Sequence, residues 1–311
     1  MKSKRKIALL IAALLFVLCF AGCGLFAPTA GSLIKKMAEN LEKAGSVKAD
    51  VSMEYEGSVS YSMLTAPIGI KMDFDVEAVR EPVVSHMKGK VDGSLYGFSI
   101  DVPVESYARQ EGGEYVSYVK ISNGAWSRQE PENSASESDT AEAAGEGGTS
   151  LIDGKTGLAL LQKIISGEIK AELAEETEMI CKKEAYRLDI EIGGEILQQL
   201  LEAASEASSG NAVSLPEGLD LSGTAAYVEL WIYKEEKLPA QIRIDCAALG
   251  NTVMQTLLKE EDYNGVTEKF ELQAVFTEYN TIDSMEIPEE VLKEAEGSSS
   301  EGLLDGILPG I

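Results

Sequence analysis

Residues 68–77 read Ile-Gly-Ile-Lys-Met-Asp-Phe-Asp-Val-Glu, with apolar side chains at alternate positions and polar residues or glycine between them. Successive side chains of a strand point to opposite faces of its sheet, so this segment has one apolar and one polar face. Such alternation is typical of antiparallel sheets, because strands of parallel sheets are buried on both faces and read as continuous apolar runs. The same pattern recurs in 49–56, 86–92, 98–104, 186–192, 226–232, 240–246 and 270–276.

Three other segments, 33–44, 158–165 and 196–204, place apolar residues at helical spacing. Ser32 stands just before the first of them and is suited to cap a helix there. Nine or more amphipathic strands present more apolar surface than three helices can cover, unless the sheet curls round them. The sequence therefore predicts an α+β fold: a strongly curved antiparallel β-sheet, or half-barrel, with about three helices covering the concave side.

A sheet of this shape would enclose an apolar cavity suited to a ligand. The alternative is an ordinary packed core, because periodicity does not distinguish a filled interior from a hollow one. The ligand-binding residues expected on the concave side are Met53, Tyr55, Met72, Phe74, Met87 and Phe98.

The first residues of the chain have the pattern of an export signal. Four basic residues among the first six precede residues 7–20, which carry no charge. As a helix this run would span about 21 Å, less than the roughly 30 Å hydrocarbon core of a bilayer. Its length and the small residues Ala21 and Gly22 at its end predict a signal peptide, residues 1–22, cleaved between Gly22 and Cys23.

Residues 19–23 resemble the bacterial lipobox, whose cysteine thiol receives a diacylglyceryl group before cleavage. The family pattern prefers Leu, Val or Ile three residues before the cysteine, where this chain has Phe20. The resemblance implies that Cys23 is lipidated and anchors the protein to the cell membrane on its extracytoplasmic face. The alternative is a plain signal peptide cleaved nearby, with Cys23 a free thiol.

The remaining chain is expected to form one domain with flexible additions. Residues 23–31 would be a lipidated tether, 32–295 a single half-barrel domain and 296–311 a flexible tail. Within the domain, 127–150 is rich in Ser, Glu, Gly and Ala. Such a segment buries too little apolar surface to offset its chain entropy, which predicts a disordered acidic insertion.

Charge narrows the classes of partner. The chain has 27 basic and 52 acidic residues, and without residues 1–22, which hold four of the basic ones, the net charge is −29. Nucleic acids and anionic lipid headgroups both require Lys and Arg, so neither is an expected partner. If Cys23 is acylated, Cys181 and Cys246 are the only two thiols of the processed chain that could form a disulfide, although the apolar neighbours of Cys246, Ile242 and Ile244, favour a buried free thiol.

The sequence lacks the usual signs of an enzyme. Its single histidine, His86, alternates onto the polar face of a strand with Lys88 and Lys90. It contains no Gly-x-Ser-x-Gly, His-Glu-x-x-His or phosphate-binding glycine loop. Paired carboxylates could serve a glycosidase, but a solvated strand face explains them better. We therefore predict no catalytic residues, no cofactor and no metal.

Several segments in the same order resemble lipoproteins of the LolA/LppX type, in their uncharacterised Gram-positive branch. They are the lipobox, the helix 33–41, the strand 47–55, and the segments 185–192, 194–201, 228–239 and 276–280. The resemblance implies a half-barrel whose apolar cavity holds lipid acyl chains, and thus a carrier or lipid-handling role. The alternative is an envelope sensor or scaffold that binds another exported protein through an exposed edge strand.

Overall fold

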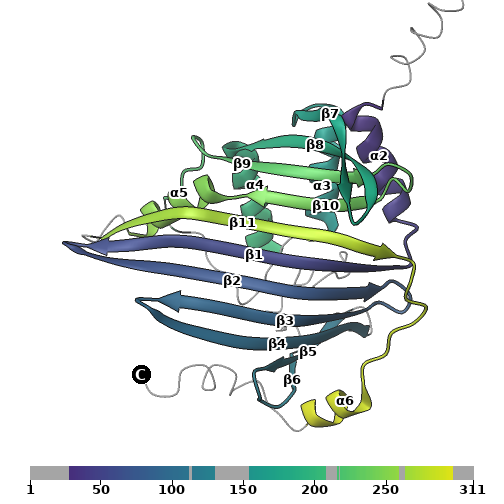
Figure 1. Ribbon diagram of the computed structural model, residues 1–311, viewed down its shortest axis with the longest axis horizontal. Helices are drawn as coiled ribbons and strands as arrows, with labels where there is room; N and C mark the ends of the chain where they lie inside the picture. Colours follow the sequence, from purple (N-terminus) through teal and green to yellow (C-terminus); the bar gives the residue numbers. More distant parts are fainter. Residues whose placement is uncertain are drawn as a thin grey trace, which may run out of the picture.

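A computed structural model describes residues 28–111, 114–129, 154–207, 216, 218–258 and 263–296. The described strands form a single antiparallel sheet of eleven strands, accompanied by five helices (Figure 1). In chain order the elements are α2 (Ala30–Leu41), β1 (Ser46–Tyr61), β2 (Leu64–Val79), β3 (Val84–Leu95), β4 (Phe98–Glu111), β5 (Glu114–Ile121), β6 (Ser127–Gln129), α3 (Gly154–Ser166), β7 (Ala171–Ile180), β8 (Lys183–Gly193), α4 (Gly194–Ala207), β9 (Ala225–Tyr233), β10 (Pro239–Asp245), α5 (Ala247–Leu257), β11 (Tyr263–Tyr279) and α6 (Glu289–Ala295).

The first and last long strands lie together in the middle of the sheet. The strand order is β6-β5-β4-β3-β2-β1-β11-β10-β9-β8-β7, so each half is a simple meander leading outward from the β1–β11 pair. The outer strands β6 and β7 do not pair with each other, and the sheet is therefore open. The antiparallel sheet predicted from the alternating segments is confirmed.

The register carries one row of apolar residues across ten strands. Because neighbouring residues in a row share a face, the alternation of each strand adds up to one continuous apolar side of the sheet. From β7 to β5 the row is Leu173, Leu188, Leu230, Ile242, Ala274, Val51, Phe74, Gly89, Val104 and Ile121.

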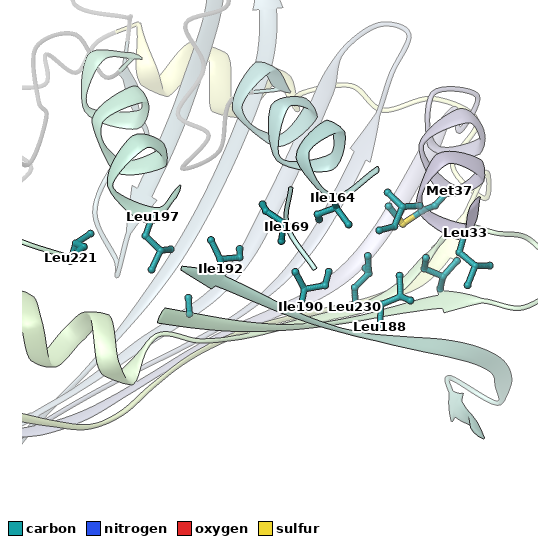
Figure 2. Packing of buried hydrophobic residues seen from close by; sticks show 13 residues of the cluster. Leu33, Met37, Ile164, Ile169, Leu188, Ile190, Ile192, Leu197, Leu221 and Leu230 are labelled. Atoms are coloured by element: carbon teal, nitrogen blue, oxygen red, sulfur yellow. The ribbon is translucent and has the colours of Figure 1, made fainter. Parts of the chain in front are cut away.

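Helices cover this apolar side over β7–β10. Figure 2 shows side chains of α2, α3 and α4, among them Leu33, Ile164 and Leu197, pointing onto the strands below. Ile34 on α2, and Leu188 and Ile232 on the strands, have no exposed surface. Burying a side chain of this size stabilises the fold by about 1.5–3 kcal/mol, so this layer is the main core. The three predicted helices are confirmed.

The cap of α2 differs from the prediction. Thr29, not Ser32, precedes the helix, and its side chain accepts a hydrogen bond from the backbone N–H of Ser32. The Ser32 side chain in turn accepts one from the backbone N–H of Thr29, which completes a capping box. The helix starts earlier because both residues are needed to satisfy its free N–H groups.

Two further helices were not predicted, so the expected count of about three was wrong. Helix α5 follows β10 directly and is held to β11 by Asn251, whose side chain exchanges two hydrogen bonds with the backbone of Thr267. Its Gly, Asn, Thr and Val residues have low helix propensity, so tertiary contacts decide its conformation. Helix α6 has only seven residues, too few for a helical period to be recognised.

Helix α6 packs on the face of the sheet opposite to the one that α2, α3 and α4 cover. Val291 and Ala295 bury a small cluster there with Val116, Tyr118 and Trp126. A second cluster on this face joins Ala185, Trp231, Tyr233 and Ala240. The polar face predicted from alternation is therefore apolar at two places.

The boundary expected for the acidic insertion was also wrong at its start. Ser127–Gln129 form strand β6 on β5, and Ser127 is buried. The rest of the predicted insertion, 130–150, lies outside the described residues. So do the signal peptide, the tether as far as residue 27, and the tail from residue 297 onward. Cys181 is exposed, Cys246 is buried, and both thiols are free.

Candidate functional site

The apolar side of the sheet continues beyond the helix layer onto β11 and β1–β4. Met53 lies between Leu272 and Met72, and Tyr55 between Phe270 and Ile70. We call this surface the open apolar face. It consists of Val51, Met53, Tyr55, Ile70, Met72, Phe74, Val76, Met87, Val91, Val102, Val104, Phe270, Leu272, Ala274 and Phe276.

Burial distinguishes this surface from the core on the same side of the sheet. Leu188, Leu230 and Ile232, beneath the helices, are 0–5% exposed, whereas every residue of the open apolar face is only half-buried. The main core cluster and the residues packed against it include none from β1–β4 or β11. Among the described residues, the helices thus leave the apolar side of β11 and β1–β4 partly accessible.

Two aromatic rings on the open apolar face lie across glycines of the sheet. A Cβ placed on Gly89 would lie 2.6 Å from the Phe74 ring, and one on Gly57 would lie 2.8 Å from the Tyr55 hydroxyl. The Tyr55 ring also meets Phe270 edge-on, with centroids 5.9 Å apart. Glycine at these positions lets the rings lie low on the sheet, which keeps the face shallow and continuous.

The structure brings the six predicted ligand-binding residues onto one side of the sheet. Five of them, Met53, Tyr55, Met72, Phe74 and Met87, belong to the open apolar face. Phe98 is on the same side but stands at the β3–β4 turn, opposite Leu95, and is 80% exposed. That these residues bind a ligand stays a prediction.

A hollow of about 390 Å³ lies over β1–β4 near their turns. Of the six predicted residues it includes Tyr55 alone, and five charged side chains contribute to its lining. Lys90 lies 2.8 Å from Asp92 and 3.6 Å from Asp101, and its hydrogen bond holds the pKa of Asp92 below the usual range. The charged lining residues belong to the register rows of Glu54 and Glu56, on the face opposite to the open apolar face, so the hollow is chiefly a feature of the polar face.

The contribution of β11 to this site was not predicted. The alternation of Phe270, Leu272 and Ala274 shows in the sequence, but nothing local indicates that they adjoin Met53 and Tyr55. Only pairing between the first and last strands brings them together. The signal available from the sequence was the matching length of two long alternating segments.

His86, the histidine considered for catalysis, lies on the polar face of the sheet and contacts side chains of the neighbouring strand. His86 Nε2 lies 2.9 Å from Glu105 Oε1, and its ring stacks on Tyr107 with centroids 4.3 Å apart. Both contacts hold the imidazole against neighbouring strands. The residues of the open apolar face, by contrast, supply no acid, base or nucleophile apart from the Tyr55 hydroxyl.

Comparison with known proteins gives distant structural matches. The crystal structure of Mycobacterium tuberculosis lipoprotein LppX matches 83% of this chain and 100% of its own, with 14% identity and a TM-score of 0.40. A DUF1329 family protein from Desulfovibrio piger matches 82% and 93%, with 9% identity and a TM-score of 0.19. No family model and no curated protein matches the sequence. The first structure is a lipoprotein of the type that the sequence resembles.

Membrane attachment rests on residues that the structure does not describe. Cys23 and Gly22, the predicted lipidation and cleavage positions, lie outside the described residues. Within the described part of the chain, each helix is too short or too polar to cross a bilayer.

Proposed function

We propose that this protein binds the acyl part of a lipid on the open apolar face and acts as a carrier or lipid-handling protein. The observation that supports this proposal is the contrast in burial along single rows of the sheet, where Leu230 is 5% exposed and Val51 and Phe74 are half-buried. An acyl chain laid along these rows would cover the surface that α2–α4 leave accessible. Each methylene so buried contributes about 0.8 kcal/mol.

The chemistry of the face suits binding better than catalysis. Its side chains are aliphatic, thioether or aromatic, and methionines 53, 72 and 87 adapt readily to ligands of differing shape. We propose that the protein is a lipid-anchored, extracytoplasmic lipoprotein attached through Cys23, as its amino-terminal sequence predicts. A binding protein of this kind needs no cofactor and no catalytic residue.

The experiment is a pair of variants measured with a fluorescent palmitate analogue. Met53→Ser with Met72→Ser places two hydroxyls side by side on the open apolar face, because the two residues are cross-strand neighbours. Met179→Ser is the matched control, since Met179 stands at the end of β7 and is 63% exposed. We expect the double variant to bind the analogue at least tenfold more weakly, about 1.4 kcal/mol, and the control to bind like the wild type.

Native mass spectrometry of the purified protein supplies an independent readout, in which co-purifying acyl species are expected. Protein that is free of lipid, together with equal binding by all three proteins, would refute acyl binding on this face.

A second candidate function is a sensor or scaffold that takes up a strand of another exported protein. The supporting observation is that, among the described strands, none pairs with the outer edge of β7. That strand carries four glutamates and an irregular register between Leu173 and Thr177, features that discourage strand addition. Retention of one defined protein in pull-downs from membranes, lost on β7 substitution, would favour this candidate over the carrier.

A further inference from the structure

Exposed apolar residues gather at one end of the sheet, where the β1–β2 and β3–β4 turns lie beside the start of β11 (left in Figure 1). Among the described residues, fourteen large apolar side chains are exposed, and nine of them lie at this end. Met63 is 97% exposed, Phe98 80% and Leu64 67%. Exposed clusters of this kind mark surfaces that meet a membrane or a partner.

Three described segments that form this end carry no charge. Residues 57–70, 93–100 and 263–267 contain no Asp, Glu, Lys or Arg, and we call these three segments the uncharged end. Charged residues make up 25% of the chain, so 27 residues would be expected to include about seven. Residues 259–262, which precede β11, are charged and lie outside the described residues. The polar residues of the uncharged end are instead Ser, Thr, Asn and Tyr.

The turns hold side chains where glycine or asparagine would be easier to accommodate. Ser62 has a φ of 56° and Tyr96 a φ of 52°, both in the left-handed region. Two-residue hairpin turns favour Asn or Gly at such positions, because a Cβ there is close to the backbone. Tyr96 is nevertheless 59% exposed, so packing within the protein does not account for its presence.

We propose that the uncharged end inserts shallowly into a lipid bilayer. Methionine, leucine and phenylalanine at the tips suit the acyl region, and the tyrosines suit the headgroup boundary, where aromatic rings with a polar group are favoured. Tyr61 and Tyr263 already pack together, with ring centroids 4.7 Å apart. The three segments offer hydrogen-bonding groups but no charged side chain that could fix the orientation of a protein partner.

The register determines how the two turns would meet a bilayer. Leu95 is opposite Ile68, and Ile68 is opposite Gly57, so Tyr61 stands four residues beyond the level of Leu95. The β1–β2 turn therefore extends about 13 Å past the β3–β4 turn. Both turns reach the plane of the bilayer surface only when the strands are tilted from the bilayer normal. The open apolar face then extends away from the bilayer, starting at the contact.

The contact would be separate from the predicted lipid anchor. Helix α2, where the described chain begins, lies toward the opposite end of the sheet from the uncharged end (Figure 1). A lipid on Cys23 and the uncharged end would then be two points of attachment. The second does not depend on acyl binding by the open apolar face, although it would bring that face to its source of lipid.

The test uses a tryptophan placed in the uncharged end of the full chain, reconstituted in phosphatidylcholine vesicles that contain brominated acyl chains. Trp126 and Trp231 are 6% and 3% exposed, so added emission reports the new position. Phe98→Trp should lose most of its added emission to the bromines and shift to shorter wavelength. Tyr227→Trp, on the opposite face of β9 and also exposed, should show neither effect.

Salt and turn variants sharpen the test. Because the three segments of the uncharged end contain no Lys or Arg, quenching of the tryptophan in Phe98→Trp should be unchanged by added NaCl. Tyr96→Asn should raise the melting temperature, since asparagine adopts the left-handed backbone conformation with less strain than tyrosine. Added to Phe98→Trp, it should weaken the quenching of that tryptophan, because it removes an inserted ring. Equal quenching of Phe98→Trp and Tyr227→Trp would overturn the proposal. So would a Phe98→Trp protein whose tryptophan is not quenched and whose β3–β4 turn cross-links to another protein.

Insertion of the uncharged end and acyl binding by the open apolar face can be tested separately, because different residues carry them. Met63→Ser with Leu64→Ser should reduce the quenching of Phe98→Trp severalfold and leave binding of the soluble palmitate analogue unchanged. Met53→Ser with Met72→Ser should do the reverse. Loss of quenching with both pairs alike would show that the contact at this end is not specific and would overturn the insertion.

Discussion

Gly89→Ala is the sharpest test of the sheet that carries the open apolar face. A Cβ on Gly89 would lie 1.9 Å from the Asp73 carbonyl oxygen and 2.8 Å from Phe74 Cα. An ordinary contact begins near 3.4 Å, so the methyl group is short of space by about 1.5 Å. Both contacts are backbone atoms of β2, which is paired with β3 along twelve residue pairs and cannot simply rotate away.

Overpacking of this kind costs about 1–3 kcal/mol. Part of the cost is offset, because alanine restricts the unfolded chain and stabilises the protein by about 0.4–1 kcal/mol wherever the native backbone accepts it. Taking the middle of each range, the net expectation for Gly89→Ala is a loss of about 1.3 kcal/mol of unfolding free energy. Gly193→Ala is the matched control, since no atom lies within 4 Å of its added Cβ and its φ is not left-handed.

The assay is equilibrium unfolding in urea followed by the fluorescence of the two buried tryptophans. With a slope of about 2–3 kcal/mol per molar, the midpoint of Gly89→Ala should fall by roughly 0.5 M, and that of Gly193→Ala should rise slightly. The two glycines are thus expected to respond with opposite signs. Midpoints that move together, or a Gly89→Ala midpoint at or above the wild type, would refute the packing of Phe74 over β3.

Two further predictions concern the core and the free thiols. Ile34→Ala on α2 should lower the unfolding free energy by about 2–4 kcal/mol, because the side chain has no exposed surface and its loss leaves a cavity; a urea midpoint within error of the wild type would contradict the helix layer. Burial raises the pKa of the Cys246 thiol to about 11, so little thiolate is present at neutral pH. Peptide mapping after maleimide treatment should find Cys181 modified and Cys246 unmodified until urea is added, and rapid native labelling of Cys246 would show that its burial is wrong.

Much of the architecture follows from local sequence pattern. The alternation in 68–77 fixes which side chains of β2 share a face, because the period of a strand is two and does not depend on its neighbours. The spacing of Leu33, Ile34 and Met37 likewise predicts both the helix and its buried face. These patterns identified antiparallel strands, three helices and the six residues that now lie on one side of the sheet.

The tertiary structure alone decided which strands are neighbours and which part of the apolar side is covered. Val51 lies beside Ala274 through hydrogen bonds between the two ends of the chain, and alternation fixes a face without specifying the strand that pairs with it. The same holds for helix α5, whose weak propensity is overridden by Asn251 and Thr267, and for the uncharged end, where three distant segments meet. Periodicity determines how each element faces the core, whereas pairing between distant segments determines what the core leaves exposed.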